Sequence, residues 1–209
     1  MYSATMYVVG VRGPHAPRDE TRARILETAQ QLIGEKGFVA TSTRELCERM
    51  GFTKAALYYH FQTKDELLGV LVAPLLEALS ALVDGRVVDP SPRARRQALV
   101  AYVDLVASHQ GLMRVLSEDP SVRQHQALAP AADIFRRLTQ LLAGQQEPDT
   151  ASRVRVRAAL GSVHAALLRT QPDDDLSVLV PVALSAACGA LGLPRPAVPA
   201  PRSPNDHHE

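Results

Sequence analysis

The 209-residue chain has few aromatic side chains and no tryptophan, so other apolar residues must build its core. Aromatic residues make up 4% of the chain, whereas hydrophobic residues together make up 46%. Leucine, valine and alanine therefore have to fill the interior, and such a composition suits packed helices. We expect an all-α protein, because the sequence shows no convincing strand pattern and no internal repeat.

Cysteine is scarce as well, with only Cys47 and Cys188 in the chain. Two thiols provide neither a disulfide framework nor the spacing of a zinc site. We therefore expect no metal, no cofactor and a reducing, cytoplasmic location. Cys47 is interpreted as a small buried residue, because that role is far commoner than redox sensing.

The sequence also lacks a signal-peptide core and any apolar run that we judge long and pure enough to span a bilayer. No membrane partner is therefore expected. Residues 1–17 are predicted to form a disordered arm. Residues 194–209 contain five prolines and few apolar side chains, and they are predicted to form a disordered tail.

No charge of one sign dominates the chain. The formal net charge is +1, and residues 1–82 contain nine Lys/Arg and nine Asp/Glu. A basic footprint is the usual first sign of a nucleic-acid-binding protein. Bulk charge therefore gives no support to DNA binding, and such a function must depend on where individual charged groups lie.

Residues 41–68 carry the most informative pattern, two short helices and the start of a third. The first helix is predicted over 43–50, and Gly51 can adopt the left-handed conformation that ends a helix. The second helix is predicted over 54–61, capped by Thr53. A helix, a tight glycine turn and a short second helix form a helix-turn-helix, whose second helix enters the major groove of DNA.

Two start signals support these helix boundaries. Ser42 precedes Glu45 by three residues, and Thr63 precedes Glu66 by three residues. Both pairs fit the capping box, in which a hydroxyl and a carboxyl satisfy free backbone N–H groups at the helix start.

Over roughly residues 21–82 the sequence resembles the TetR family of bacterial transcriptional repressors. The order of features carries the resemblance: an amphipathic helix TRARILETAQQLIGEKG, Phe38, the Gly51 turn, the run LYYHF and the helix start TKDELL. The resemblance implies an N-terminal three-helix DNA-binding domain, placed at 18–66. It also implies a C-terminal helical domain for ligand binding and dimerisation, placed at 67–193.

The resemblance further implies which residues contact DNA. Arg44 is expected at a base edge or phosphate, although a solvated arginine is the alternative. His60 is alternatively a helix-end histidine bonded to carbonyls. Because alanines offer only methyl contacts, specificity should depend on Arg44 and Lys54. The full set of expected DNA contacts is Thr43, Arg44, Thr53, Lys54, Ala55, Ala56, Tyr58, Tyr59, His60 and Lys64.

The rest of the chain reads as a series of apolar helices. They are predicted at 64–82, 93–109, 111–117, 120–144 (one helix or two), 150–170 and 173–191, and Pro74 is expected to kink the first. The small effector implied by the family would enter an apolar cavity among them. Candidate pocket residues are Tyr102, Leu105, His109, Met113, Phe135 and His164.

The last two helices carry small side chains at helical spacing, which would let another helix approach closely. In the family these helices build a four-helix dimer interface. The alternative is packing within one chain. The candidate interface residues are Ala158, Gly161, Ala165, Leu184, Ala187 and Leu191.

These observations favour a ligand-responsive transcriptional repressor that binds a near-palindromic double-stranded DNA operator as a homodimer. A small, mostly apolar effector would release it. One alternative is a DNA-binding regulator without an effector, switched by a protein partner. A helical enzyme is disfavoured, because no nucleophile–base pair or metal motif appears.

Overall fold

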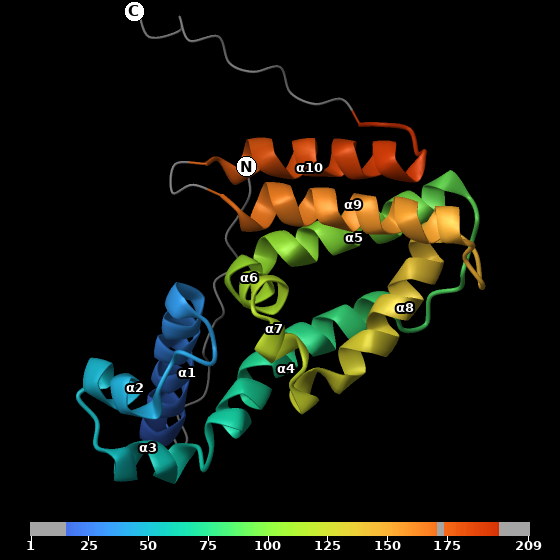
Figure 1. Ribbon diagram of the computed structural model, residues 1–209. Coiled ribbons are helices and arrows are strands. Elements are labelled where there is room, and N and C mark those ends of the chain that lie inside the picture. The colour runs from blue at the N-terminus through green and yellow to red at the C-terminus, as the bar shows by residue number, and fades with distance from the viewer. Residues whose placement is uncertain (1–15, 171–173, 197–209) are drawn as a thin grey trace, which may run out of the picture. The chain divides into compact units, whose positions relative to one another are not determined.

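The computed structural model describes residues 16–170 and 174–196, and all regular secondary structure within them is helical (Figure 1). The all-α prediction is therefore confirmed. The elements are α1 (Ala16–Lys36), α2 (Thr43–Met50), α3 (Lys54–His60), α4 (Lys64–Val83), α5 (Pro92–Ser108), α6 (Gln110–Glu118), α7 (Pro120–Arg123), a 3-10 turn η1 (Gln126–Leu128), α8 (Ala129–Ala143), α9 (Thr150–Leu168) and α10 (Leu176–Leu191).

The predicted arm and tail fall mostly outside the described residues. Helix α1 begins at Ala16, so the last two residues of the predicted arm are helical rather than disordered. The last helix was expected from residue 173, which is not described, and α10 begins at Leu176 with Asp175 as its cap.

The chain divides into two compact units, residues 1–67 and 68–209. The division falls inside α4, which therefore belongs to both units. From the sequence we placed the boundary one residue earlier, between residues 66 and 67.

A small apolar core holds the first unit together. Helix α1 buries Ile25, Ala29 and Leu32 completely, and α2 and α3 add buried Leu46 and Leu57. The spacing of the α1 residues is that of one helix face, as expected from the sequence. An ion pair at the surface joins α1 to α2, because both terminal nitrogens of Arg49 donate to the Glu35 carboxylate at 2.8 and 3.1 Å.

The capping boxes are only partly formed. The Ser42 and Thr63 hydroxyls accept from the backbone N–H groups of Glu45 and Glu66 at 3.2 and 2.9 Å, as expected. The return bonds differ, because Glu45 forms an ion pair with Lys36 and Glu66 accepts from the N–H of Gln62 at 2.7 Å. Our prediction of two complete boxes was wrong, since a nearby cation competes for the first carboxylate.

In the second unit, α9 and α10 lie side by side over α5 (Figure 1). Their facing surfaces bury small and branched side chains, among them Ala159, Val163, Ala187 and Cys188, all fully buried. Burial raises the pKa of the Cys188 thiol, as it does for Cys47 in the first unit, so both thiols stay protonated near neutral pH.

Helix α4 corrects one reading of the sequence. By length and composition, Lys64–Val83 is long and apolar enough to cross a membrane. From the sequence alone, no segment of this kind is expected. The core helix of a soluble protein passes the same test, and α4 buries Leu68, Leu75 and Leu79 within the protein. Pro74 lies inside α4, and the helix continues past it to Val83.

Candidate nucleic-acid interface and ligand cavity

The turn between α2 and α3 has the geometry expected of a helix-turn-helix. Gly51 ends α2 in the left-handed conformation, with φ of 67°. The N–H of Phe52 donates to the carbonyl of Cys47 at 2.8 Å, which closes the turn. The Thr53 hydroxyl then accepts from the N–H of Ala56 at 3.2 Å and caps α3. The predicted glycine turn and threonine cap are both confirmed.

Helix α3 buries one face and leaves the other to solvent. Leu57 and the following Phe61 are buried, and they anchor the helix in the core. The exposed side chains include Tyr58 and Tyr59, at 46% and 67% exposure. The exposed set on and before α3 is Thr53, Lys54, Ala55, Ala56, Tyr58 and Tyr59.

The two expected contact residues of α2 lie at its first turn. Thr43 is half-buried, whereas Arg44 extends from the surface and its Nε donates to Glu48 at 2.7 Å. The hydrogen bond and charge of Glu48 raise the pKa of Arg44, so it remains a cation. An exposed pair of this kind is worth little, so Arg44 is free to exchange Glu48 for a DNA acceptor.

His60 and Lys64 stand in different surroundings from the exposed set. Nδ1 of His60 is buried and has no hydrogen-bond partner among the described residues, so the helix-end carbonyls of the alternative interpretation do not bond this atom. Lys64 donates to the carbonyl of Phe38, and its ammonium lies 4.1 Å from the centre of the Phe38 ring. Lys64 therefore also joins the start of α4 to the loop after α1, a role that the sequence did not indicate.

Two arginines of α1 add positive charge that sequence reasoning missed. The guanidinium of Arg18 lies 4.9 Å from the centre of the Tyr59 ring, and that of Arg22 lies 4.6 Å from the centre of the Phe61 ring. Their four-residue spacing places both on one face of α1, but only the fold brings that face to α3. Arg18 and Arg22 thus place two cations beside the C-terminal end of α3, whereas Lys54 adds a third at its N-terminal end.

Residues 25–71 match the family described as bacterial regulatory proteins, tetR family. The chain is a member of the TetR family. The matched residues cover the helix-turn-helix and the start of α4, which are the elements just described.

Curated relatives of this TetR-family chain are named as transcriptional regulators and repressors, not as enzymes. The chain is 31% identical over 126 residues to the transcriptional activator FasR of Mycolicibacterium smegmatis, covering 56% of this chain and 55% of that protein. It is 34% identical over 94 residues to the class A tetracycline repressor protein of Escherichia coli, covering 42% and 44%. The matches thus span about half the length of these relatives.

The solved structure of a TetR-family transcriptional regulator, PfmR from Thermus thermophilus, extends the likeness in fold. It shares 27% identity with a TM-score of 0.60, and the match covers 81% of this chain and 98% of that one. The described helices beyond the helix-turn-helix therefore also follow a TetR-family arrangement.

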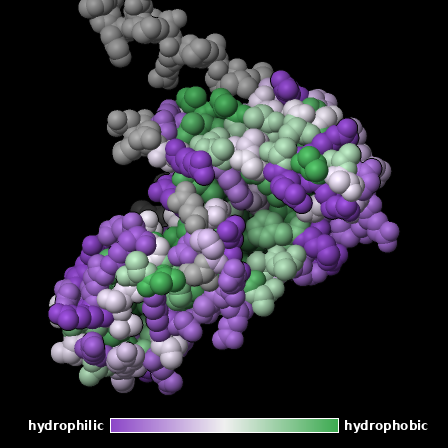
Figure 2. Space-filling view, viewed as in Figure 1, coloured by the Kyte–Doolittle hydropathy of each residue, from purple (hydrophilic) through white to green (hydrophobic). Residues whose placement is uncertain are grey.

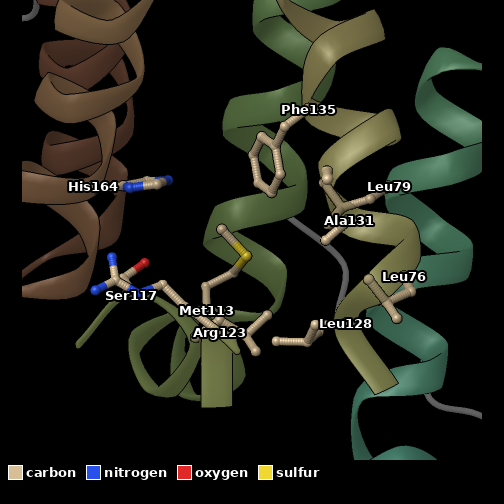
Figure 3. A pocket seen from close by; sticks show the side chains of 11 residues that line it. Leu76, Leu79, Met113, Ser117, Arg123, Leu128, Ala131, Phe135 and His164 are labelled. Atoms are coloured by element: carbon tan, nitrogen blue, oxygen red, sulfur yellow. The ribbon is translucent and has the colours of Figure 1, made fainter. Parts of the chain in front are cut away.

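The second unit of the TetR-family chain contains a cavity of about 400 Å³. Helices α4, α6, α7, α8 and α9 and the turn η1 contribute to its wall (Figure 3). A cavity of this size and apolar character is typical of small-molecule sites. The lining residues are Leu76, Leu79, Met113, Leu116, Ser117, Arg123, Leu128, Ala131, Ala132, Phe135 and His164.

Three of the six expected pocket residues line this cavity, namely Met113, Phe135 and His164. Tyr102 lies behind the wall, fully buried and bonded to His164. Leu105 and His109 do not line it, and the carbonyl of Leu105 bonds Nδ1 of His109 at 3.0 Å instead. Those two residues therefore lie outside this cavity, because a helix pattern gives the buried face but not which part of that face stays unfilled.

The expected dimer residues separate into an exposed and a buried group. Ala158, Gly161 and Ala165 are exposed on α9, and a Cβ added at Gly161 would meet nothing within 4 Å. Ala187 and Leu191 are buried within the chain, at 0% and 4% exposure, so assigning them to an interface was wrong. Leu184 is half-buried. The two buried residues follow the alternative interpretation, packing inside one chain.

Helix α10 nevertheless presents apolar surface from other positions. Leu176, Val178 and Val182 are exposed at 40%, 48% and 41%. Figure 2 shows this apolar surface over α10. Together with exposed Val154 of α9, these residues give the last two helices an outward apolar face, although at positions that the sequence did not single out.

Proposed function

We propose that the protein is a cytoplasmic, ligand-responsive transcriptional repressor that binds a near-palindromic operator as a homodimer. A small, mostly apolar effector in the cavity of the second unit releases it from DNA. The observation that carries the proposal is the solvent-exposed face of α3, the second helix of a complete helix-turn-helix, in a chain of the TetR family.

The exposed residues of α2 and α3 suit the division of labour in DNA recognition. Lys54 and Arg44 are exposed cations that can reach base edges, with Ala55 and Ala56 offering methyl contacts to thymine. Tyr58 and Tyr59 offer hydroxyls to phosphates, which position a protein without reading sequence. Arg18, 4.9 Å from the Tyr59 ring, adds a cation beside them.

The cavity supports an effector over a switch by a protein partner. A regulator without an effector has no use for an unfilled apolar space, since empty cavities cost stability. The cavity wall includes Leu76 and Leu79 of α4, and α4 continues into the DNA-binding unit. A ligand that prefers one position of α4 would therefore shift DNA affinity, and DNA would change ligand affinity by the same factor.

The outward apolar face of α9 and α10 supports a dimer. Exposed apolar residues gathered on neighbouring helices are typical of interaction surfaces, and a two-fold dimer reads a palindromic site with one α3 in each half. Small residues at Ala158, Gly161 and Ala165 would let α9 of a partner approach closely.

The test is selection of DNA from a random library by the full chain, followed by affinity measurements. We expect an enriched near-palindrome with half-sites about 10 base pairs apart or a multiple of that. Arg44→Ala should relax base preference at one position per half-site, at a cost of about 1–3 kcal/mol. Arg24→Ala is the matched control, because it removes an exposed arginine of α1. Failure to enrich any site, or equal behaviour of both variants, would contradict the proposal.

A further inference from the structure

The polar groups of the cavity gather at one end. Figure 3 shows the Arg123 guanidinium beside Ser117, with His164 on the same side, whereas Leu76, Leu79, Leu128, Ala131 and Phe135 occupy the other side. No acidic side chain lines the cavity among the described residues. A molecule that fills this space therefore meets a cation and polar groups at one end and only carbon at the other.

Arg123 is available to such a molecule. Within the described part of the chain its side chain forms no ion pair or hydrogen bond, whereas Arg114 on neighbouring α6 is occupied with the carbonyl of Leu168 at 2.9 Å. A guanidinium matches the planar geometry of a carboxylate and can donate two parallel hydrogen bonds to it.

Tyr102 decides what His164 offers to the cavity. The Tyr102 oxygen lies 2.6 Å from Nε2 of His164, and the phenol is fully buried. If Nε2 carried the proton, the phenol O–H would have no acceptor among the described residues, and a buried unpaired hydroxyl is costly. The satisfied arrangement has the phenol donating to Nε2, which leaves the proton on Nδ1.

The Nδ1–H of His164 is then a free donor. This nitrogen has no hydrogen-bond partner in the described structure. Among the described residues, Nδ1 of His60 is the only side-chain nitrogen that is both buried and without a partner. Nδ1 of His164 is therefore not fully buried. The ring lines the cavity. Tyr102 is thus a positioning residue that turns His164 into a hydrogen-bond donor facing the ligand space.

We propose that the cavity binds a monocarboxylic acid with an apolar body, its carboxylate held by Arg123, Ser117 and the Nδ1–H of His164. The apolar body lies against Leu76, Leu79, Leu128 and Phe135. A volume of about 400 Å³ holds roughly a dozen water-sized groups at about 30 Å³ each. This inference rests on the proposed role of the cavity as the effector site and names the class of effector.

The experiment measures binding of matched pairs of probes to the full chain by calorimetry. The probes are linear and aryl monocarboxylic acids of about ten to twenty non-hydrogen atoms, each compared with its primary alcohol. We expect acids to bind at least about tenfold more tightly than their alcohols. Arg123→Met should abolish this preference, and Arg93→Met, which removes an exposed arginine on α5, should keep it.

Tyr102→Phe provides a readout that a merely structural role would not move. Nitrogen NMR of the wild type should show His164 protonated on Nδ1, and the variant should shift the proton toward Nε2 and lower the acid-to-alcohol preference. Equal binding of acids and alcohols, a preference unchanged in Arg123→Met, or no binding by any probe would each overturn the inference. Alcohols that bind as well as acids and release operator DNA would overturn the acid class while leaving the ligand-responsive repressor intact.

Discussion

Arg95 of α5 joins the ends of two other helices, and its replacement should destabilise the second unit. Its Nε donates to the carbonyl of Leu142 at 2.7 Å, in the last turn of α8. Its Nη2 donates to the carbonyl of Leu191 at 3.1 Å, at the end of α10. A cation at two helix C-termini satisfies free carbonyls and favours both helix dipoles.

The expected loss follows from these two bonds. Hydrogen bonds to a charged group contribute about 1.5–3 kcal/mol each. Arg95 is half-buried, and burial lowers its pKa. Because the site is only half-buried, water can hydrate the two carbonyls in part when the guanidinium is removed, which reduces the loss. We therefore expect Arg95→Met to lower the free energy of unfolding by about 2–3 kcal/mol, and the melting temperature by about 4–12 °C.

Urea and thermal unfolding followed by circular dichroism would measure this loss, at a fixed protein concentration because the proposed dimerisation would shift apparent stability. Arg93→Met is the control, since Arg93 is exposed on the same helix. Arg95→Lys should fall between the wild type and Arg95→Met, because one ammonium lacks the fork that reaches both carbonyls. Equal stability of the Arg93→Met and Arg95→Met variants would refute the reasoning.

Three further predictions concern pH, assembly and coupling. Burial lowers the pKa of His164, so the unfolded chain takes up a proton first. The free energy of unfolding should therefore fall as pH drops below about 6.5, and His164→Asn should reduce that slope in urea titrations at several pH values. Gly161→Leu should give monomers in sedimentation with weak operator affinity while each chain stays folded, because the site is open; an intact dimer would place the interface elsewhere. Pro74→Ala should change the ligand–DNA coupling, typically about 1–3 kcal/mol in such systems, more than either affinity, and an unchanged coupling in titrations would reduce Pro74 to a packing residue.

Local chemistry was predictable from the sequence, whereas contacts between distant residues were not. The bounds of α2 and the left-handed Gly51 follow from neighbours within a few positions. The bonds from Arg95 to Leu142 and Leu191 join residues 47 and 96 positions apart, and no local pattern announces them. The contacts of Lys64 with Phe38 and of Arg18 with Tyr59 were not predicted for the same reason, since each joins residues far apart in the sequence.

The cavity shows a second limit of sequence reasoning. Helical periodicity predicted inward-facing positions such as Leu105 and Phe135 equally well, but of these two only Phe135 lines the cavity. Whether a buried side chain meets a neighbour or a void depends on the volumes of residues from several helices at once. Arg123 was missed for another reason, because α7 has four residues and too short a pattern to read.

The balanced charge of the DNA-binding unit is compatible with local positive charge beside α3. Three of its acids, Glu35, Glu45 and Glu48, form ion pairs with Arg49, Lys36 and Arg44. Arg18, Arg22 and Lys54 form no ion pair in the described structure, and the two arginines lie over aromatic rings of α3 and the residue that follows it. Exposed charges are screened beyond about 8–10 Å at physiological salt. A phosphate near α3 therefore senses mainly the charged groups within that range, so local placement rather than net charge sets the potential there.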